Sequence, residues 1–206
     1  MSQKRTGILL LAASIIALLI GLIIGTSAPS VPTQITRTQQ ITITSLATVA
    51  VQAQGQAGFT EYCFSSGYGT TADCADVVIK YFNQATSSIH VLIYDLTLPE
   101  IRDALIAAKN RGVDVKIVMD STQANSQYSQ FANLNAAGVN VRLSRGAYEM
   151  HDKLAIIDGH IVITGSFNYT ADSNYNNDEN LVVLDSQALA AAYEQEFQTI
   201  WNASAP

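Results

Sequence analysis

Three short runs of β-branched and apolar residues alternate with segments that have helical periodicity and end at glycine. The runs cover residues 89–94, 113–119 and 139–143. Apolar runs of this length are typical of buried strands. Pro99 opens a predicted helix that ends at Gly112, and another predicted helix over 125–137 ends at Gly138. This β-α-β-α-β order predicts a parallel sheet covered by helices.

The pattern changes in the second half of the chain. Residues 153–157 and 160–164 flank Asp158-Gly159, a dipeptide that favours a tight hairpin turn. We expect a further strand over 180–184, a final helix over 186–202, and an early helix over 74–86 capped by Asp73. The predicted fold class is therefore α/β, with a mixed, mostly parallel sheet sandwiched by helices, in one domain over 58–206.

The N-terminal part is of a different kind. Residues 7–25 carry no charge, and nineteen residues at about 1.5 Å each span roughly 28 Å, close to the thickness of a bilayer core. Lys4 and Arg5 precede this segment. The positive-inside tendency therefore puts residues 1–6 in the cytoplasm and the domain outside. Residues 26–57, rich in Thr, Gln and Ser, are interpreted as a linker, with a possible short strand over 41–51.

The alternative for residues 7–25 is a signal peptide that is cleaved, which would give a secreted protein. The best small-residue cleavage site, Thr26-Ser27-Ala28, is followed by Pro29, which is unfavourable after a cleavage point. The sequence therefore favours a single-pass transmembrane anchor in the cell membrane. Either way the domain is exported.

The chain has two cysteines, Cys63 and Cys74. In an exported protein they can form a disulfide that closes a short loop rich in Gly, Ser and Thr. The alternative is two unpaired thiols, one of them buried in a helix. Their spacing does not indicate a metal site, because no histidine or further cysteine lies nearby in the sequence.

The charge of the domain bears on its substrate. From Phe59 onward there are eight basic and 17 acidic residues, a net charge of −9. Proteins that bind the phosphate backbone of nucleic acid usually carry a basic surface. A nucleic-acid substrate would therefore need a local basic cleft.

The most informative stretch is residues 151–158, followed by Gly165-Ser166-Phe167-Asn168. Side chains alternate between the two faces of a strand, so His151 and Lys153 should point the same way. Asp158 has the opposite parity, which makes it a poor candidate for direct contact with a substrate. We interpret Asp158 as a turn and structural residue.

These residue types suit phosphoryl chemistry. An imidazole near neutral pKa can attack phosphorus and leave again. A lysine on the same face supplies positive charge to the phosphoryl oxygens. Asn168 and Ser166 share a parity and can donate hydrogen bonds to the same oxygens. A nucleophilic histidine also needs a carboxylate to fix its tautomer, and Glu179 is the candidate.

His-x-Lys-x4-Asp followed by Gly-Ser-x-Asn resembles the signature of the phospholipase D superfamily. The resemblance covers about residues 59–202 and includes Tyr94-x-Leu-Thr, residues 111–115 and the Glu179-Asn180 step. Only one copy of the motif is present. This resembles the single-motif branch, which includes a bacterial EDTA-resistant endonuclease.

The resemblance implies a homodimer in which two His-Lys sets meet at one shared site. His151 of one chain would attack and form a phosphohistidine, and His151 of the other would protonate the leaving oxygen and then activate water. Lys153 and Asn168 would hold the phosphate, with Ser166 secondary and Glu179 orienting His151. Asp158 and Gly165 would complete the motif, and no metal or other cofactor is implied. Asp95 is a departure, because related enzymes often have serine after the strand tyrosine.

Other candidates are less specific. His90 and His160 have no partner pattern and are interpreted as structural. Arg145, with Arg142, precedes the site and either guides a backbone phosphate or is a solvated surface residue. Tyr148 either stacks on a base or lipid headgroup or simply packs.

Three functions follow from these observations. The leading one is a metal-independent endonuclease acting on DNA or RNA outside the cytoplasmic membrane. The second is a phospholipase D or phosphatidyl transferase, which an anchor over residues 7–25 would favour by holding the site near lipid headgroups. The third is a non-catalytic surface scaffold, against which the intact set of motif residues argues.

Overall fold

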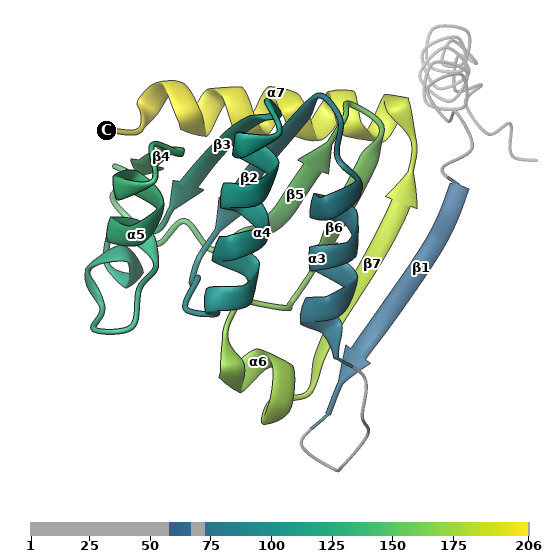
Figure 1. The fold of residues 1–206 in the computed structure, drawn as a ribbon, viewed down its shortest axis with the longest axis horizontal. Helices are drawn as coiled ribbons and strands as arrows, with labels where there is room; N and C mark the ends of the chain where they lie inside the picture. Colours follow the sequence, from purple (N-terminus) through teal and green to yellow (C-terminus); the bar gives the residue numbers. More distant parts are fainter. Residues whose placement is uncertain (1–57, 67–72, 206) are drawn as a thin grey trace, which may run out of the picture. The chain divides into compact units, whose positions relative to one another are not determined.

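The computed structural model describes residues 58–66 and 73–205, which build a seven-stranded sheet with helices on both faces (Figure 1). The strands are β1 (Gly58–Ser65), β2 (Ser88–Ile93), β3 (Asp114–Met119), β4 (Asn140–Leu143), β5 (Lys153–Ile157), β6 (Ile161–Gly165) and β7 (Glu179–Asp185). The helices are α3 (Cys74–Gln84), α4 (Pro99–Asn110), the 3-10 turn η1 (Gln123–Asn125), α5 (Phe131–Ala136), α6 (Ala171–Tyr175) and α7 (Gln187–Ala203).

The strand order is β1-β7-β6-β5-β2-β3-β4. The pairs β2–β3 and β3–β4 are parallel, and β2–β5, β5–β6, β6–β7 and β1–β7 are antiparallel. The predicted mixed α/β sheet is thus confirmed, but "mostly parallel" was wrong for the described strands. After β4 the chain returns beside β2 in the opposite direction, and a hairpin turn and then a longer connection through α6 make β5, β6 and β7 antiparallel neighbours.

The predicted β-α-β-α-β order in the first half is confirmed, with two differences in detail. The helix expected over 125–137 is only six residues long as α5, and a short 3-10 turn precedes it. The sequence analysis also missed β1 and α6. β1 pairs only with β7, far along the chain, so local pattern gave no register for it.

The hairpin between β5 and β6 forms as expected, but β6 begins at Ile161 and not at His160, so three residues join the two strands. Asp158 and Gly159 have φ values of 52° and 70°, both in the left-handed region. Left-handed residues at the centre of a tight turn match the right-handed twist of the strands that the turn joins. The turn fixes the register in which Ile157 faces Ile161.

The sheet separates two hydrophobic cores. Ala155 and Ile157 of β5 face the larger core with α3 and α4, while Leu154 and Ile156 face a second core with Phe197 and other residues of α7. β5 is therefore covered by a hydrophobic core on each face and is buried along its whole length. Such a strand is a rigid support for the residues at its two ends.

Two further features concern the N-terminal side of the domain. A disulfide joins Cys63 of β1 to Cys74, the first residue of α3. The predicted anchor over 7–25, linker over 26–57 and strand over 41–51 all lie outside the described residues. Within 58–66 and 73–205, no helix is both long and apolar enough to cross a membrane.

Candidate active site

His151 and Lys153 come together at the start of β5. Lys153 is the first residue of the strand, and His151 lies just before it. The Lys153 Nζ atom lies 3.1 Å from His151 Nδ1 and donates to the backbone oxygen of His151 at 2.8 Å. His151 is exposed to solvent, whereas Lys153 is only 9% exposed. The pair thus offers an accessible imidazole beside a buried cation.

The surroundings of Lys153 act on its charge in two directions. Burial lowers the pKa of Lys153, because a low-dielectric environment disfavours the ammonium form. Four nearby carboxylates raise it again, and the ammonium form is the one that attracts phosphate. They belong to Asp152, Glu179, Glu149 and Asp95.

Ser166 and Glu179 form a second group next to this pair. The Ser166 hydroxyl donates to the Glu179 carboxylate and accepts from the backbone N–H of Asn180 at 3.1 Å. Glu179 also accepts from Ser173 Oγ at 3.3 Å and from Asn177 Nδ2 at 3.2 Å. Among the hydrogen bonds of the described residues, none joins Glu179 to His151. The structure therefore brings Glu179 to Ser166, and its expected role on His151 stays a prediction.

Gly165 explains why this loop begins with glycine. Its φ of 149° is a conformation that other residues rarely adopt. A Cβ atom placed on Gly165 would lie 2.2 Å from the backbone oxygen of Asn180, which cannot move without breaking the β6–β7 ladder. The absence of a side chain lets β7 approach closely and brings Glu179 up to Ser166.

Two buried oxygens near the site have no hydrogen-bond partner within the described part of the chain: Oδ1 of Asn168 and Oδ1 of Asp95. Buried polar groups without partners are uncommon and often mark functional sites. Burial, followed by the nearby Asp172 carboxylate, raises the pKa of Asp95, although hydrogen bonding by Leu96 and the charge of Lys153 oppose this. A raised pKa makes it easier to protonate the Asp95 carboxylate, at a position where related enzymes often have serine, when a phosphate lies beside it.

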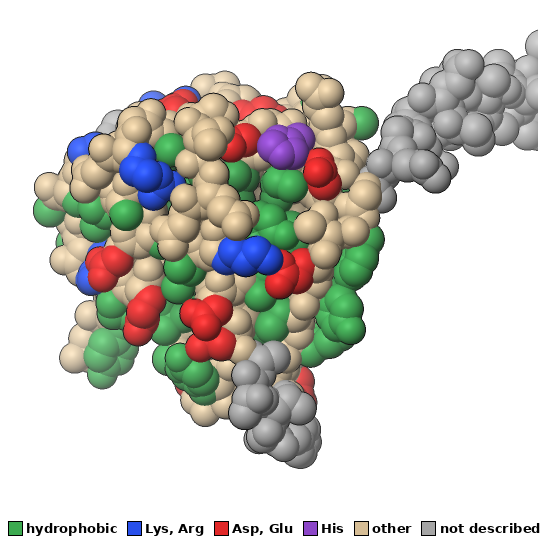
Figure 2. Space-filling view, turned by 45° about the vertical axis from the view of Figure 1, so that its right-hand side comes forward, with side chains coloured by type: hydrophobic (Ala, Val, Ile, Leu, Met, Phe, Trp, Pro, Cys, Tyr) green, Lys and Arg blue, Asp and Glu red, His purple; other side chains and the backbone are tan. Residues whose placement is uncertain are grey.

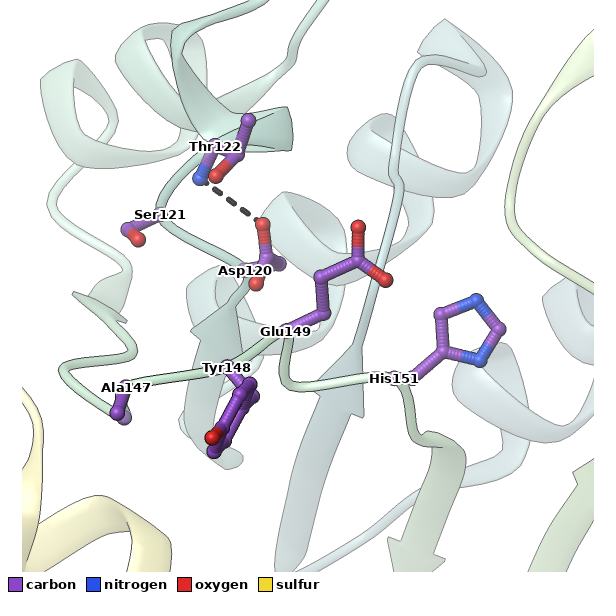
Figure 3. Close-up of a pocket in the computed structure, with 8 residues that line it drawn as sticks. Asp120, Ser121, Thr122, Ala147, Tyr148, Glu149 and His151 are labelled. Atoms are coloured by element: carbon purple, nitrogen blue, oxygen red, sulfur yellow. Dashed lines mark hydrogen bonds between the residues drawn. The ribbon is translucent and has the colours of Figure 1, made fainter.

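His151 lines two pockets on either side of a short loop. One pocket, of about 590 Å³, also contains Asp120, Thr122 and Glu149. The other, of about 300 Å³, contains Arg145 and residues from the end of α7. Figure 3 shows the Tyr148 ring pointing to the opposite side of this loop from the Glu149 carboxyl. Tyr148 is 91% exposed, so it does not pack against the core.

Several contacts at the site were not predicted from the sequence. The Tyr94 ring lies beside the His151 ring, with centroids 4.5 Å apart and the ring planes tilted by 53°. Asp120 accepts from the backbone N–H groups of Met150 and Thr122, and so ties the end of β3 to the loop before His151. Gln123 donates to the Tyr94 hydroxyl at 2.9 Å. Tyr94 ends the predicted strand over 89–94 and belongs to the Tyr94-x-Leu-Thr resemblance, and Asp120 directly follows the predicted strand over 113–119.

The remaining candidates lie elsewhere or act structurally. Asp158 sits in the turn at the far end of β5, about five residues along the strand from Lys153. His90 is buried, with Nδ1 2.9 Å from Glu194 and its ring stacked on Phe197. Arg142 donates to the backbone oxygen of Trp201 and lies over its ring, which removes it from the site.

The surface charge agrees with the acidic composition. On the face shown in Figure 2, acidic side chains lie between the basic ones, and no basic stripe is visible. In the residues that the structure describes, no group of three or more His, Cys, Asp and Glu side chains is arranged to hold a metal ion. The positive charge at the site itself comes from Lys153, with Arg145 in the adjoining pocket.

The chain belongs to the phospholipase D superfamily. The family described as "Cardiolipin synthase, PLD-like domain" matches residues 78–201, more than half of the chain. The structure of Nuc, a phospholipase D family member from Salmonella typhimurium, is similar with a TM-score of 0.65 and 33% identity. This match covers 70% of the present chain and 94% of Nuc.

Two curated relatives are also similar in sequence. The mitochondrial cardiolipin hydrolase of Chlamydomonas reinhardtii is 34% identical over 135 residues, which are 66% of this chain and 60% of that protein. The phospholipase D of Rickettsia conorii is 33% identical over 133 residues, which are 65% of this chain and 66% of that protein. The chain therefore spans about three fifths of the Chlamydomonas relative it matches.

Proposed function

We propose that the domain is a metal-independent endonuclease that hydrolyses phosphodiester bonds of DNA or RNA through a phosphohistidine at His151. The observation that carries the proposal is the exposed imidazole of His151 held 3.1 Å from the buried ammonium of Lys153 at the wall of an open pocket. A nucleophile beside a fixed positive charge suits attack on an anionic phosphorus centre.

The chemistry runs in two displacements. An unprotonated ring nitrogen of His151 forms a bond to phosphorus as the bond from phosphorus to the leaving oxygen breaks, and a second acid protonates that oxygen. Water then attacks phosphorus and releases the imidazole. The Lys153 ammonium can only donate hydrogen bonds. Its contact with His151 Nδ1 therefore occupies the lone pair of that nitrogen. Arrival of a phosphate gives the ammonium a better partner and frees Nδ1.

The second acid is the basis for a homodimer in the proposal. The described residues contain one His-x-Lys motif, so His151 of a second copy would protonate the leaving oxygen. The pocket that contains Arg145 is lined by Thr199, Ile200 and Ala203 of α7, which places it on the α7 side of the sheet. A partner that approaches from this side would bring its own His151 near.

An apolar surface on the same side of the sheet supports such pairing. Phe59, Tyr62 and Phe64 of β1 are 61%, 58% and 57% exposed. Through the β1–β7 and β6–β7 registers, Phe59 shares a face with Val162, which packs in the α7 core. Sedimentation of the protein at micromolar concentration should give a dimer. Tyr62→Glu with Phe64→Glu should give a monomer with little activity, and a fully active monomer would refute the shared site.

The nucleic-acid substrate is supported by the similarity to Nuc, which the chain covers along nearly its whole length. The second candidate is hydrolysis of a phospholipid headgroup. Its support is that relatives at similar identity are named cardiolipin hydrolase and phospholipase D. The acidic surface also fits a lipid with one or two phosphates better than a polyanion. An anchor over 7–25 in the cell membrane, with the domain outside the cytoplasm, would serve either substrate.

The experiment uses the full-length protein in mild detergent with excess EDTA. Single-stranded DNA, double-stranded DNA, RNA, and vesicles with cardiolipin or phosphatidylcholine are supplied separately. We expect cleavage of nucleic acid, lost in His151→Ala and kept in His160→Ala, which removes an exposed histidine away from the site. Hydrolysis of lipid alone would replace the proposal by the second candidate, and binding without turnover would favour a scaffold.

A further inference from the structure

We propose that Tyr94 is a positioning residue, whose ring holds the Lys153 ammonium and the His151 imidazole side by side and keeps the buried lysine charged. The proposal rests on the proposed function, in which these two side chains act on a phosphodiester. Tyr94 itself makes no contact with the reacting atoms in this account. It would act through the two residues that do.

The ring of Tyr94 touches both partners. The Lys153 Nζ atom lies over the Tyr94 ring, 4.7 Å from its centroid, and the His151 ring centroid lies 4.5 Å away. A cation over an aromatic face within about 6 Å is attracted by the negative face of the ring. The Lys153–His151 contact of 3.1 Å closes the triangle. Each of the three side chains therefore limits the positions open to the other two.

The backbone fixes Tyr94 in the middle of this arrangement. The Tyr94 N–H donates to the backbone oxygen of Asp152 at 3.0 Å, which extends the β2–β5 pairing by one step. Asp152 lies between His151 and Lys153 in the sequence. The ring is thus anchored opposite the residue that separates its two partners.

The hydroxyl end of Tyr94 is held from two other segments. It accepts from Gln123 Nε2 at 2.9 Å and donates to Glu149 Oε1 at 3.4 Å. Burial and the Glu149 charge raise the pKa of Tyr94, so the phenol stays protonated and brings no negative charge to the site. η1 and the loop before His151 are therefore connected to the site through one ring.

The Tyr94 ring can stabilise the ammonium form of Lys153, and this matters because Lys153 is buried. Burial favours loss of the proton, while the surrounding carboxylates of Asp152, Glu179, Glu149 and Asp95 oppose that loss. A desolvated cation–π contact stabilises the ammonium form further, and its usual strength corresponds to about a twofold to thirtyfold change in the protonation constant. Without the Tyr94 ring, Lys153 would deprotonate at lower pH, and the His151 ring would lose a neighbour that limits its position.

The direct test measures the titration of Lys153 by NMR of the lysine side chains in the full-length protein, without substrate. Lys153→Arg identifies the signal. In Tyr94→Leu we expect the Lys153 midpoint to fall by about 0.4 to 1.5 pH units. In Tyr94→Phe, which keeps the ring and loses the hydroxyl, it should stay near the wild-type value. An unchanged midpoint in Tyr94→Leu would overturn the proposal.

Kinetics supply the second readout. Tyr94→Leu should lower kcat about tenfold or more with a smaller change in KM, and should move the alkaline limb of the rate profile to lower pH. Tyr94→Phe should stay within about threefold of wild type. Tyr148→Leu, at an exposed tyrosine, is the matched control for the NMR midpoint and should leave it unchanged. If leucine disturbs folding, Tyr94→Met, which is flexible and has no ring, replaces it in both measurements.

The two proposals fail separately. A shifted Lys153 midpoint in a protein that cleaves no phosphodiester would support the role of the Tyr94 ring and refute the proposed function. An active enzyme in which Tyr94→Leu and Tyr94→Phe lose stability together, with the midpoint and the rate profile unmoved, would leave the proposed function intact. It would reduce Tyr94 to a packing residue.

Discussion

A single sequence motif spans both ends of β5, but the two ends differ in whether their polar groups have hydrogen-bond partners. At the first end Lys153 is buried beside an exposed His151, and Asn168 and Asp95 nearby each keep a buried oxygen that has no partner among residues 58–66 and 73–205. At the other end both carboxylate oxygens of Asp158 accept hydrogen bonds. Its carboxylate accepts from the backbone N–H groups of Thr86, Ser87 and Ser88 and from two hydroxyls.

This difference separates chemistry from structure within one motif. Asp158 ties the β5–β6 turn to the segment that starts β2, so both strands beside the site keep their register. His151 and Lys153 sit at the other end of the same buried strand, beside buried oxygens that accept no hydrogen bond within the described part of the chain. Groups left incomplete are where a protein gives up stability for function.

The largest expected effect is on catalysis at the His151 end. His151→Ala should lower kcat by about 10³-fold or more, because it removes the proposed nucleophile. Its melting temperature should stay close to that of wild type, since the side chain is exposed and packs against no core. Steady-state kinetics with thermal unfolding checks both. An active His151→Ala would place the nucleophile elsewhere.

Lys153→Met should be the next largest. We expect a loss of about 10² to 10³ in kcat, because the fixed positive charge next to the phosphoryl oxygens disappears. Methionine fills similar space without a buried charge, so stability should be equal or higher. Kinetics and chemical denaturation of the same sample test this. A strong loss of stability with little loss of rate would make Lys153 a structural residue and remove the contrast between the two ends.

Asp158→Asn should show the opposite balance. It should lower the free energy of unfolding by about 2–4 kcal/mol, since an amide cannot accept from all five donors that the carboxylate binds. The activity of the folded fraction should stay within about threefold of wild type. Denaturant titration, followed by assays well below the melting temperature, distinguishes these effects. A large loss of kcat in fully folded Asp158→Asn would show that both ends belong to the site.

The smallest effect concerns pH. Partial burial opposes ionisation of Asp158, but the hydrogen bonds from residues 86–88 outweigh it and hold the pKa well below the usual range. A depressed pKa in the folded state contributes stability above the unfolded value of about 3.9 and loses it as the pH falls toward the folded value. The stability difference between wild type and Asp158→Asn should therefore shrink below about pH 4. A constant difference down to pH 2 would contradict it.

The sequence predicted the supports of the site better than its contacts. The buried run of β5 and the Asp158-Gly159 turn follow from local patterns, and strand parity brought His151 and Lys153 together as expected. The direction of the sheet beyond β4 was wrong, because parallel or antiparallel pairing depends on where the returning strand lands. That position is decided by long-range packing.

The contacts across the site could not be predicted from the sequence, because they too depend on long-range packing. Tyr94, Asp120 and Glu149 reach the site from different segments, and no spacing in the sequence indicates that they meet. The contact of Glu179 with Ser166 was not predicted either, because it depends on where β7 places the carboxylate. Gly165 could have been a clue to this, because a glycine at the end of a strand often marks a close approach of backbone.

The most direct test of the account is to look for the covalent intermediate. The full-length protein is mixed with the phosphodiester it turns over and quenched in base within milliseconds, and peptides that contain residue 151 are examined by mass spectrometry. The account predicts an acid-labile, base-stable phosphoryl adduct on His151, absent from His151→Ala. Rapid turnover with no adduct on His151, and with His151→Ala still active, would contradict it.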